Sequence, residues 1–207
     1  MHILPFKDPG MGERTIDDLV LFSESGKLAD VERKWTAIKK YALLVDRSHS
    51  DALAGVRAFL KERTKAPPSN EDELDDIAMA SMELDALSES DSVIVKSLIF
   101  LLLASFNEYG LKQIQKLVEP ENPPPGRGTY NWIFDWLRNQ GLQENEPDEY
   151  ESDFNRFYDP VRNKLAHGDW AALADELHAL DLTKAFCAVA FFFGRIRFKL
   201  TEMGYDA

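Results

Sequence analysis

The segment "SLIFLLLASFNEYGLKQIQKL", Ser97 to Leu117, is the strongest indication of the fold. Its middle is apolar on every side, which is typical of a helix that runs through a protein core. The wider apolar run "VIVKSLIFLLLASF" has 14 residues and contains Lys96. A membrane-spanning helix needs about 20 apolar residues. We therefore expect a buried helix from about Asp91 to Val118, and no membrane span.

Helical spacing also governs most of the remaining chain. Apolar residues recur every three or four positions from Leu28 to Val45, and again from about Ser50 to Lys65. A shorter amphipathic piece, Thr15 to Phe22, begins at a residue suited to capping a helix. The last helix is expected from about Leu182 to Met203. Almost no stretch alternates with the period of a strand, so the sequence predicts an all-α fold.

Two proline-containing stretches divide the chain. "APPSN", Ala66 to Asn70, ends the helix expected from about Ser50 to Lys65, and Asn70 is the expected N-cap of the acidic segment that follows. "EPENPPPGRG" ends the long apolar helix, since successive prolines cannot continue it. A short aromatic helix, "TYNWIFDWLRNQG", should then close at Gly141. We divide the chain into an N-terminal helical extension or small domain, residues 1–68, and a helical bundle, residues 69–207.

The charge of the chain limits its partners. Acidic residues outnumber basic ones by 36 to 24, for a formal net charge of −12. Binding duplex DNA depends on neutralising many phosphates, so we expect no duplex DNA, although a small local site for RNA remains possible. The one cysteine, Cys187, lies in the apolar run "AFCAVAFFF" and is expected to be a buried hydrophobe. Without a disulfide or a signal peptide, a cytoplasmic location is expected.

The stretch "VRNKLAHGDW", Val161 to Trp170, carries the chemistry. Arg162 and His167 are five residues apart, which places them about 140° apart around an ideal helix. They converge only if the last helical turn loosens or if a second chain completes the site. Gly168 occupies the position of a helix C-cap glycine. His167 would then lie near the negative end of the helix dipole, which favours the protonated form of its imidazole. The alternative is that both side chains merely cap helix carbonyls.

This stretch resembles the signature of the HEPN superfamily, the higher eukaryotes and prokaryotes nucleotide-binding domains. The pattern is an arginine, a short spacer that often begins with a polar residue, a histidine and commonly a glycine. Arg162, Asn163, His167 and Gly168 fill those places. In "SFNEYGLK", Ser105, Glu108 and Lys112 resemble polar positions that some members direct toward the site. The resemblance covers roughly residues 90–203.

The resemblance implies a HEPN-type helical bundle with extra N-terminal helices and a metal-independent endoribonuclease without cofactor, acting as a homodimer. Such enzymes are often toxins or effectors of stress and phage defence, and an antitoxin or regulatory protein is a possible partner. His167 would act as general acid or base, Arg162 would stabilise the phosphate and Asn163 would position either group. Glu108 joins the catalytic set. Lys164 and Lys112 are the expected RNA contacts.

Three alternatives stay open. The chain is also compatible with a non-catalytic HEPN-like module that binds a nucleotide or a protein, although the presence of both Arg162 and His167 favours activity. It is also compatible with a structural helical dimer in which Arg162 and His167 only cap a helix. Glu108, finally, has a purely local use, because Lys112 lies four residues later and the two side chains can form an ion pair on one helix face.

Overall fold

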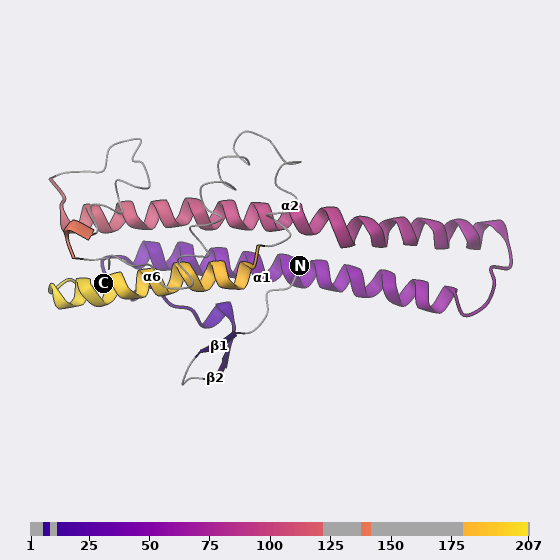
Figure 1. Ribbon diagram of the computed structural model, residues 1–207, viewed down its shortest axis with the longest axis horizontal. Coiled ribbons are helices and arrows are strands. Elements are labelled where there is room, and N and C mark those ends of the chain that lie inside the picture. Colours follow the sequence, from indigo (N-terminus) through magenta and orange to yellow (C-terminus); the bar gives the residue numbers. More distant parts are fainter. Residues whose placement is uncertain (1–5, 9–11, 122–137, 142–179, 207) are drawn as a thin grey trace.

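The computed structural model describes residues 6–8, 12–121, 138–141 and 180–206 (Figure 1). Its elements are β1 (Phe6–Asp8), β2 (Gly12–Arg14), the short 3-10 helix η1 (Ile16–Asp18), α1 (Ala29–Arg63), α2 (Glu71–Val118) and α6 (Leu182–Glu202). The predicted all-α fold is confirmed, apart from one antiparallel hairpin in which Phe6 lies opposite Arg14. Strands of three residues are too short to produce a detectable alternating pattern, so the hairpin was not predicted.

The region predicted as two helices, Leu28 to Val45 and Ser50 to Lys65, is the single helix α1. The intervening "DRSHSD" is polar but contains neither proline nor glycine, so nothing in it stops a helix. The apolar face continues through it at His49, which is 8% exposed. His49 Nε2 lies 2.8 Å from the carbonyl oxygen of Leu87 on α2. The prediction of a break here was wrong, because polarity alone does not end a helix.

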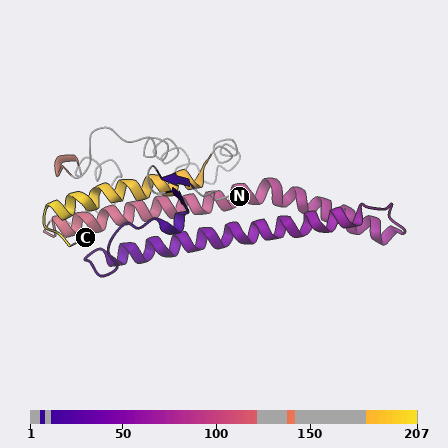
Figure 2. The same cartoon turned by 90° about the horizontal axis from the view of Figure 1, so that it is seen from below.

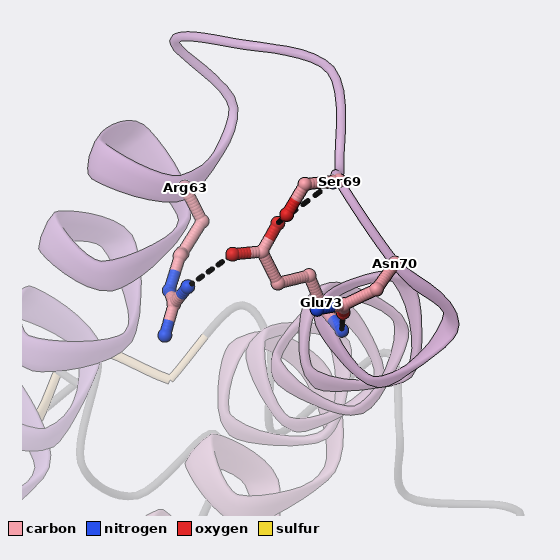
Figure 3. Close-up of polar contacts among 4 residues, drawn as sticks. All are labelled: Arg63, Ser69, Asn70 and Glu73. Atoms are coloured by element: carbon pink, nitrogen blue, oxygen red, sulfur yellow. Dashed lines mark hydrogen bonds and ion pairs between the residues drawn. The ribbon is translucent and has the colours of Figure 1, made fainter.

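Likewise, α2 runs without interruption where a separate helix was expected to start near Asp91. The predicted N-cap is confirmed: the Asn70 side-chain oxygen accepts a hydrogen bond from the Glu73 backbone N–H at 2.9 Å. Figure 3 shows this cap together with the side chain of Glu73, which accepts from the backbone and hydroxyl of Ser69 and pairs with Arg63 at 3.3 Å. The loop between α1 and α2 is therefore tied to both helices.

The last predicted helix is also confirmed. α6 ends at Glu202, and the Asp181 carboxylate caps its start by accepting from the Lys184 backbone N–H at 3.1 Å. Gly141 has φ of 68°, in the left-handed region that suits the predicted end of the aromatic helix. Most of that aromatic helix lies outside the described residues.

The core sits where three helices meet. α1 and α2 run antiparallel, and α6 packs beside the part of this pair formed by the start of α1 and the end of α2 (Figures 1 and 2). Trp35 on α1 is fully buried, with its ring centroid 5.3 Å from that of Phe106 and 5.4 Å from that of Phe186. α1, α2 and α6 thus share one hydrophobic core.

Gly110 lets α6 approach α2 closely. A Cβ atom added there would lie 2.6 Å from Cζ of the Phe193 ring, far inside normal contact distance. Cys187, also on α6, is 1% exposed, as predicted for a small core residue. Among the helices that the structure describes, none is both long enough and apolar enough to span a membrane.

Candidate functional site

Four of the predicted site residues lie outside the described residues. They are Arg162, Asn163, Lys164 and His167. The part of the candidate site that the structure does describe is its α2 side, which carries Ser105, Glu108 and Lys112. Ser105 is exposed, whereas Glu108 and Lys112 are partly buried.

Glu108 and Lys112 contact each other directly. The Lys112 ammonium lies 2.7 Å from a Glu108 carboxylate oxygen, with the two side chains 25% and 23% exposed, respectively. The ion pair that four-residue spacing allows is therefore formed. A phosphate that binds Lys112 would have to share its ammonium with Glu108, so the carboxylate sets both the position and the available charge of this lysine.

Uncharged polar side chains are buried next to this ion pair. Asn107 and Gln115 are each 1% exposed, although both lie on an otherwise apolar face of α2. Buried amides need hydrogen-bonding surroundings, so this part of α2 is polar below its surface as well as on it. The combination of buried amides and a half-buried ion pair distinguishes the last three turns of α2 from its apolar middle.

A second polar cluster lies on α1 and was not predicted. Glu32 and Lys39 are each 3% exposed, on either side of Trp35. The Glu32 carboxylate accepts from the backbone N–H groups of Leu21 and Phe22 at 2.8 and 2.9 Å.

On the same face, the Lys39 ammonium donates to the carbonyl oxygens of Asp17 and Leu19 at 2.8 and 2.6 Å. The Trp35 indole N–H donates to that Leu19 oxygen at 2.9 Å. Burial lowers the pKa of Lys39, and the nearby Glu32 carboxylate opposes this shift. These groups attach the N-terminal segment to α1, and their hydrogen bonds to its backbone indicate a structural role. Glu32 and Lys39, seven residues apart on the face of Trp35, were the available sequence signal.

Lys96, the charge within the longest apolar run, also has a structural partner. Its ammonium donates to the carbonyl oxygen of Leu180 at 3.1 Å, just before α6 begins. Burial lowers the pKa of Lys96, while the Asp181 carboxylate acts in the opposite direction. The lysine thus joins α2 to the start of α6.

Within residues 6–8, 12–121, 138–141 and 180–206, no three histidine, cysteine, aspartate or glutamate side chains are grouped to hold a metal ion. The acidic first turn of α2, Glu71 to Glu73, instead serves the helix N-terminus, where carboxylates are favoured.

Comparison with known proteins adds no assignment. No protein-family model, no curated protein and no solved structure matches the chain.

Proposed function

We propose that the protein is a metal-independent endoribonuclease of the HEPN type that acts as a homodimer in toxin action, stress or phage defence. The observation that carries this proposal is the sequence "RNKLAHG", in which Arg162, Asn163 and His167 have the order and spacing of the family signature. It is supported by the helical fold and by a long helix, α2, that carries a polar patch toward its end.

The proposed reaction uses the ribose 2′-hydroxyl as nucleophile. One imidazole of His167 removes the 2′-hydroxyl proton while the oxygen attacks phosphorus, and the bond to the 5′-oxygen breaks. A second acid, the other copy's His167 in its protonated form, donates a proton to the departing oxygen. The products are a 2′,3′-cyclic phosphate and a 5′-hydroxyl.

Arg162 would neutralise charge that develops on the phosphate, since a guanidinium forms two parallel hydrogen bonds to phosphate oxygens. Asn163 would position the imidazole or the scissile phosphate. Two copies related by a twofold axis would contribute two arginines and two histidines. That pairing would also create local positive potential on a chain of net charge −12.

Glu108 and Lys112 have a supporting part in this proposal. Their 2.7 Å ion pair gives the lysine a defined position on α2, from which it would contact an RNA phosphate beyond the reacting one. Lys164 would bind a further phosphate. Glu108 is then a positioning residue, and its negative charge also reduces the attraction of Lys112 for RNA phosphates.

A second candidate function is a non-catalytic HEPN-like module that binds a nucleotide or protein. One observation favours it: α1 and α2 continue well beyond α6 as a projecting helical pair (Figure 2). A nuclease site toward the end of α2 does not require such a projection, whereas a partner-binding protein has a use for it.

Cleavage of a labelled single-stranded RNA in EDTA distinguishes the two. We expect the wild type to cleave and to leave 2′,3′-cyclic phosphate ends. His167→Ala and Arg162→Ala should each lose at least about 100-fold in rate, the usual contribution of such groups. His178→Ala is the matched control and should cleave like the wild type. Equal cleavage by all four proteins removes the mechanism, whereas no cleavage by the wild type favours the binding module.

Lys112 is tested separately by RNA affinity. Lys112→Ala should weaken binding and reduce its salt dependence, because one phosphate contact is lost. Lys116→Ala, at an exposed lysine one turn further along α2, is the control. An equal effect of the two substitutions would mean that only general charge matters at this end of α2.

A further inference from the structure

The α1–α2 pair extends well past α6. At 1.5 Å per residue, the 48 residues of α2 extend about 72 Å, whereas the 21 residues of α6 extend only about 31 Å. Residues 46–63 of α1 and residues 71–88 of α2 therefore form a projecting segment that α6 does not reach (Figures 1 and 2). The surface of these two helices is available for contacts that α6 provides elsewhere.

A groove lies between the two helices of this projecting segment. It has a volume of about 370 Å³, and its lining includes Gly55, Val56 and Phe59 of α1 and Met79 and Ala80 of α2. Phe59 is 37% exposed and Met79 is 66% exposed. An aromatic ring and a methionine beside open apolar space are typical of surfaces that bind the apolar face of another protein.

The border of the groove is negatively charged. Asp76 and Glu83 complete its lining, and no basic side chain is among the lining residues that the structure describes. Both belong to residues 71–88 of α2, which contain seven acidic residues and no basic one. An apolar groove with carboxylates on its border is complementary in charge to an apolar surface that is flanked by cations.

The basic residues of α1 do not offset this charge. Arg57 and Lys61 each lie two positions from Phe59, which places them about 200° away around the helix, on the side opposite the groove. The guanidinium of Arg63 lies 5.5 Å from the centroid of the Phe59 ring, but it pairs with Glu73 at 3.3 Å (Figure 3). The carboxylates that line the groove therefore determine its charge.

The spacing of these carboxylates fits a helical partner. Asp76 and Glu83 are seven residues apart, so they lie on one side of α2 and about 10 Å apart along its axis. A helix laid along the groove repeats with the same period. Two of its cations, seven residues apart, would meet both carboxylates while the apolar residues between them cover Met79 and Phe59. Recognition of an amphipathic helix in a groove has this form.

We propose that the groove binds an amphipathic helix of a partner protein, whose apolar stripe is flanked by lysine or arginine side chains. The stripe covers Phe59 and Met79 and supplies most of the affinity. The cations contact Asp76 and Glu83 and set the orientation, because charge complementarity contributes more to specificity than to affinity. This binding uses none of the proposed nuclease residues and does not rest on that function.

A designed peptide tests the proposed chemistry directly. The probe is a helical peptide of about 18 residues, with leucine at every third or fourth position and lysines seven residues apart beside that stripe. Fluorescence anisotropy of the labelled peptide measures its binding to the full chain, and we expect the binding to weaken as salt is added. A control peptide with glutamate in place of each lysine should bind at least about tenfold more weakly. No binding of the lysine peptide, or equal binding of the two peptides, overturns the proposal.

Two methionine variants test whether the peptide occupies the groove. Met79→Lys places a cation in the groove and should weaken binding of the lysine peptide at least about tenfold. Met82→Lys is the matched control, because Met82 is 67% exposed and does not line the groove. It should bind the peptide like the wild type. An equal loss in both variants would mean that the peptide follows only the overall negative charge, which contradicts the proposal.

The two carboxylates are tested in the same way. Asp76→Asn combined with Glu83→Gln should weaken binding at least about threefold and reduce its salt dependence. The control combines Asp75→Asn with Asp85→Asn, which removes the same charge from exposed residues of α2 outside the groove lining. Equal effects of the two double variants would remove the proposed role of Asp76 and Glu83.

Molar mass in solution tests a second copy of the chain as the alternative occupant. A dimer that Met79→Lys dissociates and Met82→Lys does not would place a second copy in the groove and overturn the proposal. A wild type that stays at 23.6 kDa, or a dimer that both variants retain, leaves the groove open to the partner helix, as the proposal requires. RNA cleavage without peptide binding would support the nuclease alone, and peptide binding without cleavage would support the groove alone.

Discussion

The half of the α1–α2 pair beneath α6 and the part that extends past it are built from the same two helices but buried very differently. We call the extending part the arm; it comprises residues 46–63 of α1, the loop 64–70 and residues 71–88 of α2. The largest fully buried side chains of the described residues all lie in the covered half or on α6 and the N-terminal segment that packs there; they include Trp35, Phe100 and Phe193. In the arm, the least exposed side chain retains 8% of its surface. Helix continuity and helix stability therefore have separate origins in this protein.

Continuity follows from local sequence, since neither helix contains a proline and both have suitable ends. Stability follows from the third helix, which is present over only one half. We therefore expect the arm to open at lower free energy than the covered half, as regions with few buried contacts do. Each of the following substitutions compares the two halves or tests the contacts that hold one of them.

The largest difference should come from large-to-small substitutions. Trp35→Ala removes a fully buried ring that contacts α2 and α6, and should lower the free energy of unfolding by about 3–5 kcal/mol. Leu74→Ala in the arm removes a side chain that is 53% exposed, and should cost less than about 1 kcal/mol. Urea unfolding followed by circular dichroism measures both, and equal losses would mean that the two halves are equally packed.

Glycine substitutions should differ in sign between the halves. Gly110→Ala places a Cβ 2.6 Å from the buried Phe193 ring and should destabilise by about 1–3 kcal/mol despite the better helix propensity of alanine. Gly55→Ala in the arm meets no atom within 4 Å and should stabilise by up to about 1 kcal/mol. The thermal midpoints of the two variants provide the measurement; a stabilising Gly110→Ala would show that α6 is free to move away from α2.

Removing a helix cap should increase amide exchange only locally in the arm, but across the shared core when the cap belongs to α6. Asn70→Ala removes the N-cap of α2 and should cost about 1 kcal/mol, seen as faster amide exchange in residues 71–88 alone. Asp181→Ala removes the N-cap of α6, and should instead raise exchange across the shared core. Exchange that rises over the whole chain in Asn70→Ala would contradict an independently opening arm.

The smallest effect concerns the polar contact between the start of α1 and the end of α2. Tyr109 donates a hydrogen bond to the Asp30 carboxylate, and this bond, with smaller contributions from Lys34 and Arg33, lowers the pKa of Asp30 to about 2. The stabilisation that results is fully present above the ordinary value of 3.8 and is lost as the pH falls toward about 2.

Tyr109→Phe should accordingly raise the pKa of Asp30 toward its ordinary value and leave less stability to lose on acidification. A carboxyl NMR titration measures this shift directly. Tyr41→Phe, at an exposed tyrosine of α1, is the control and should leave the pKa of Asp30 unchanged. An Asp30 pKa that stays near 2 in Tyr109→Phe would assign the shift to the neighbouring cations.

Local signals predicted the helix ends better than the helix interiors. Asn70 and Gly141 have the cap geometry expected of them, and α6 starts at the predicted Leu182. The expected breaks near residues 46–51 and 88–91 were wrong, because polar residues were treated as interruptions although their backbones are as helical as their neighbours. On the candidate site, four-residue spacing correctly allowed the Glu108–Lys112 ion pair, while its use toward RNA stays a prediction.

From the amino-acid sequence alone it follows that this chain is helical, where the described helices α1, α2 and α6 begin and end, and that Cys187 is buried, because caps, prolines and apolar spacing act over a few residues. How much of each helix is covered depends on contacts between residues that are distant in the sequence. Whether the apolar face of α1 and α2 meets a third helix depends on where α6 packs. No local sequence pattern specifies how far along the α1–α2 pair α6 extends. The partners of Lys39 and Lys96 likewise depend on the tertiary structure, because their ammonium groups donate to carbonyl oxygens distant in the sequence.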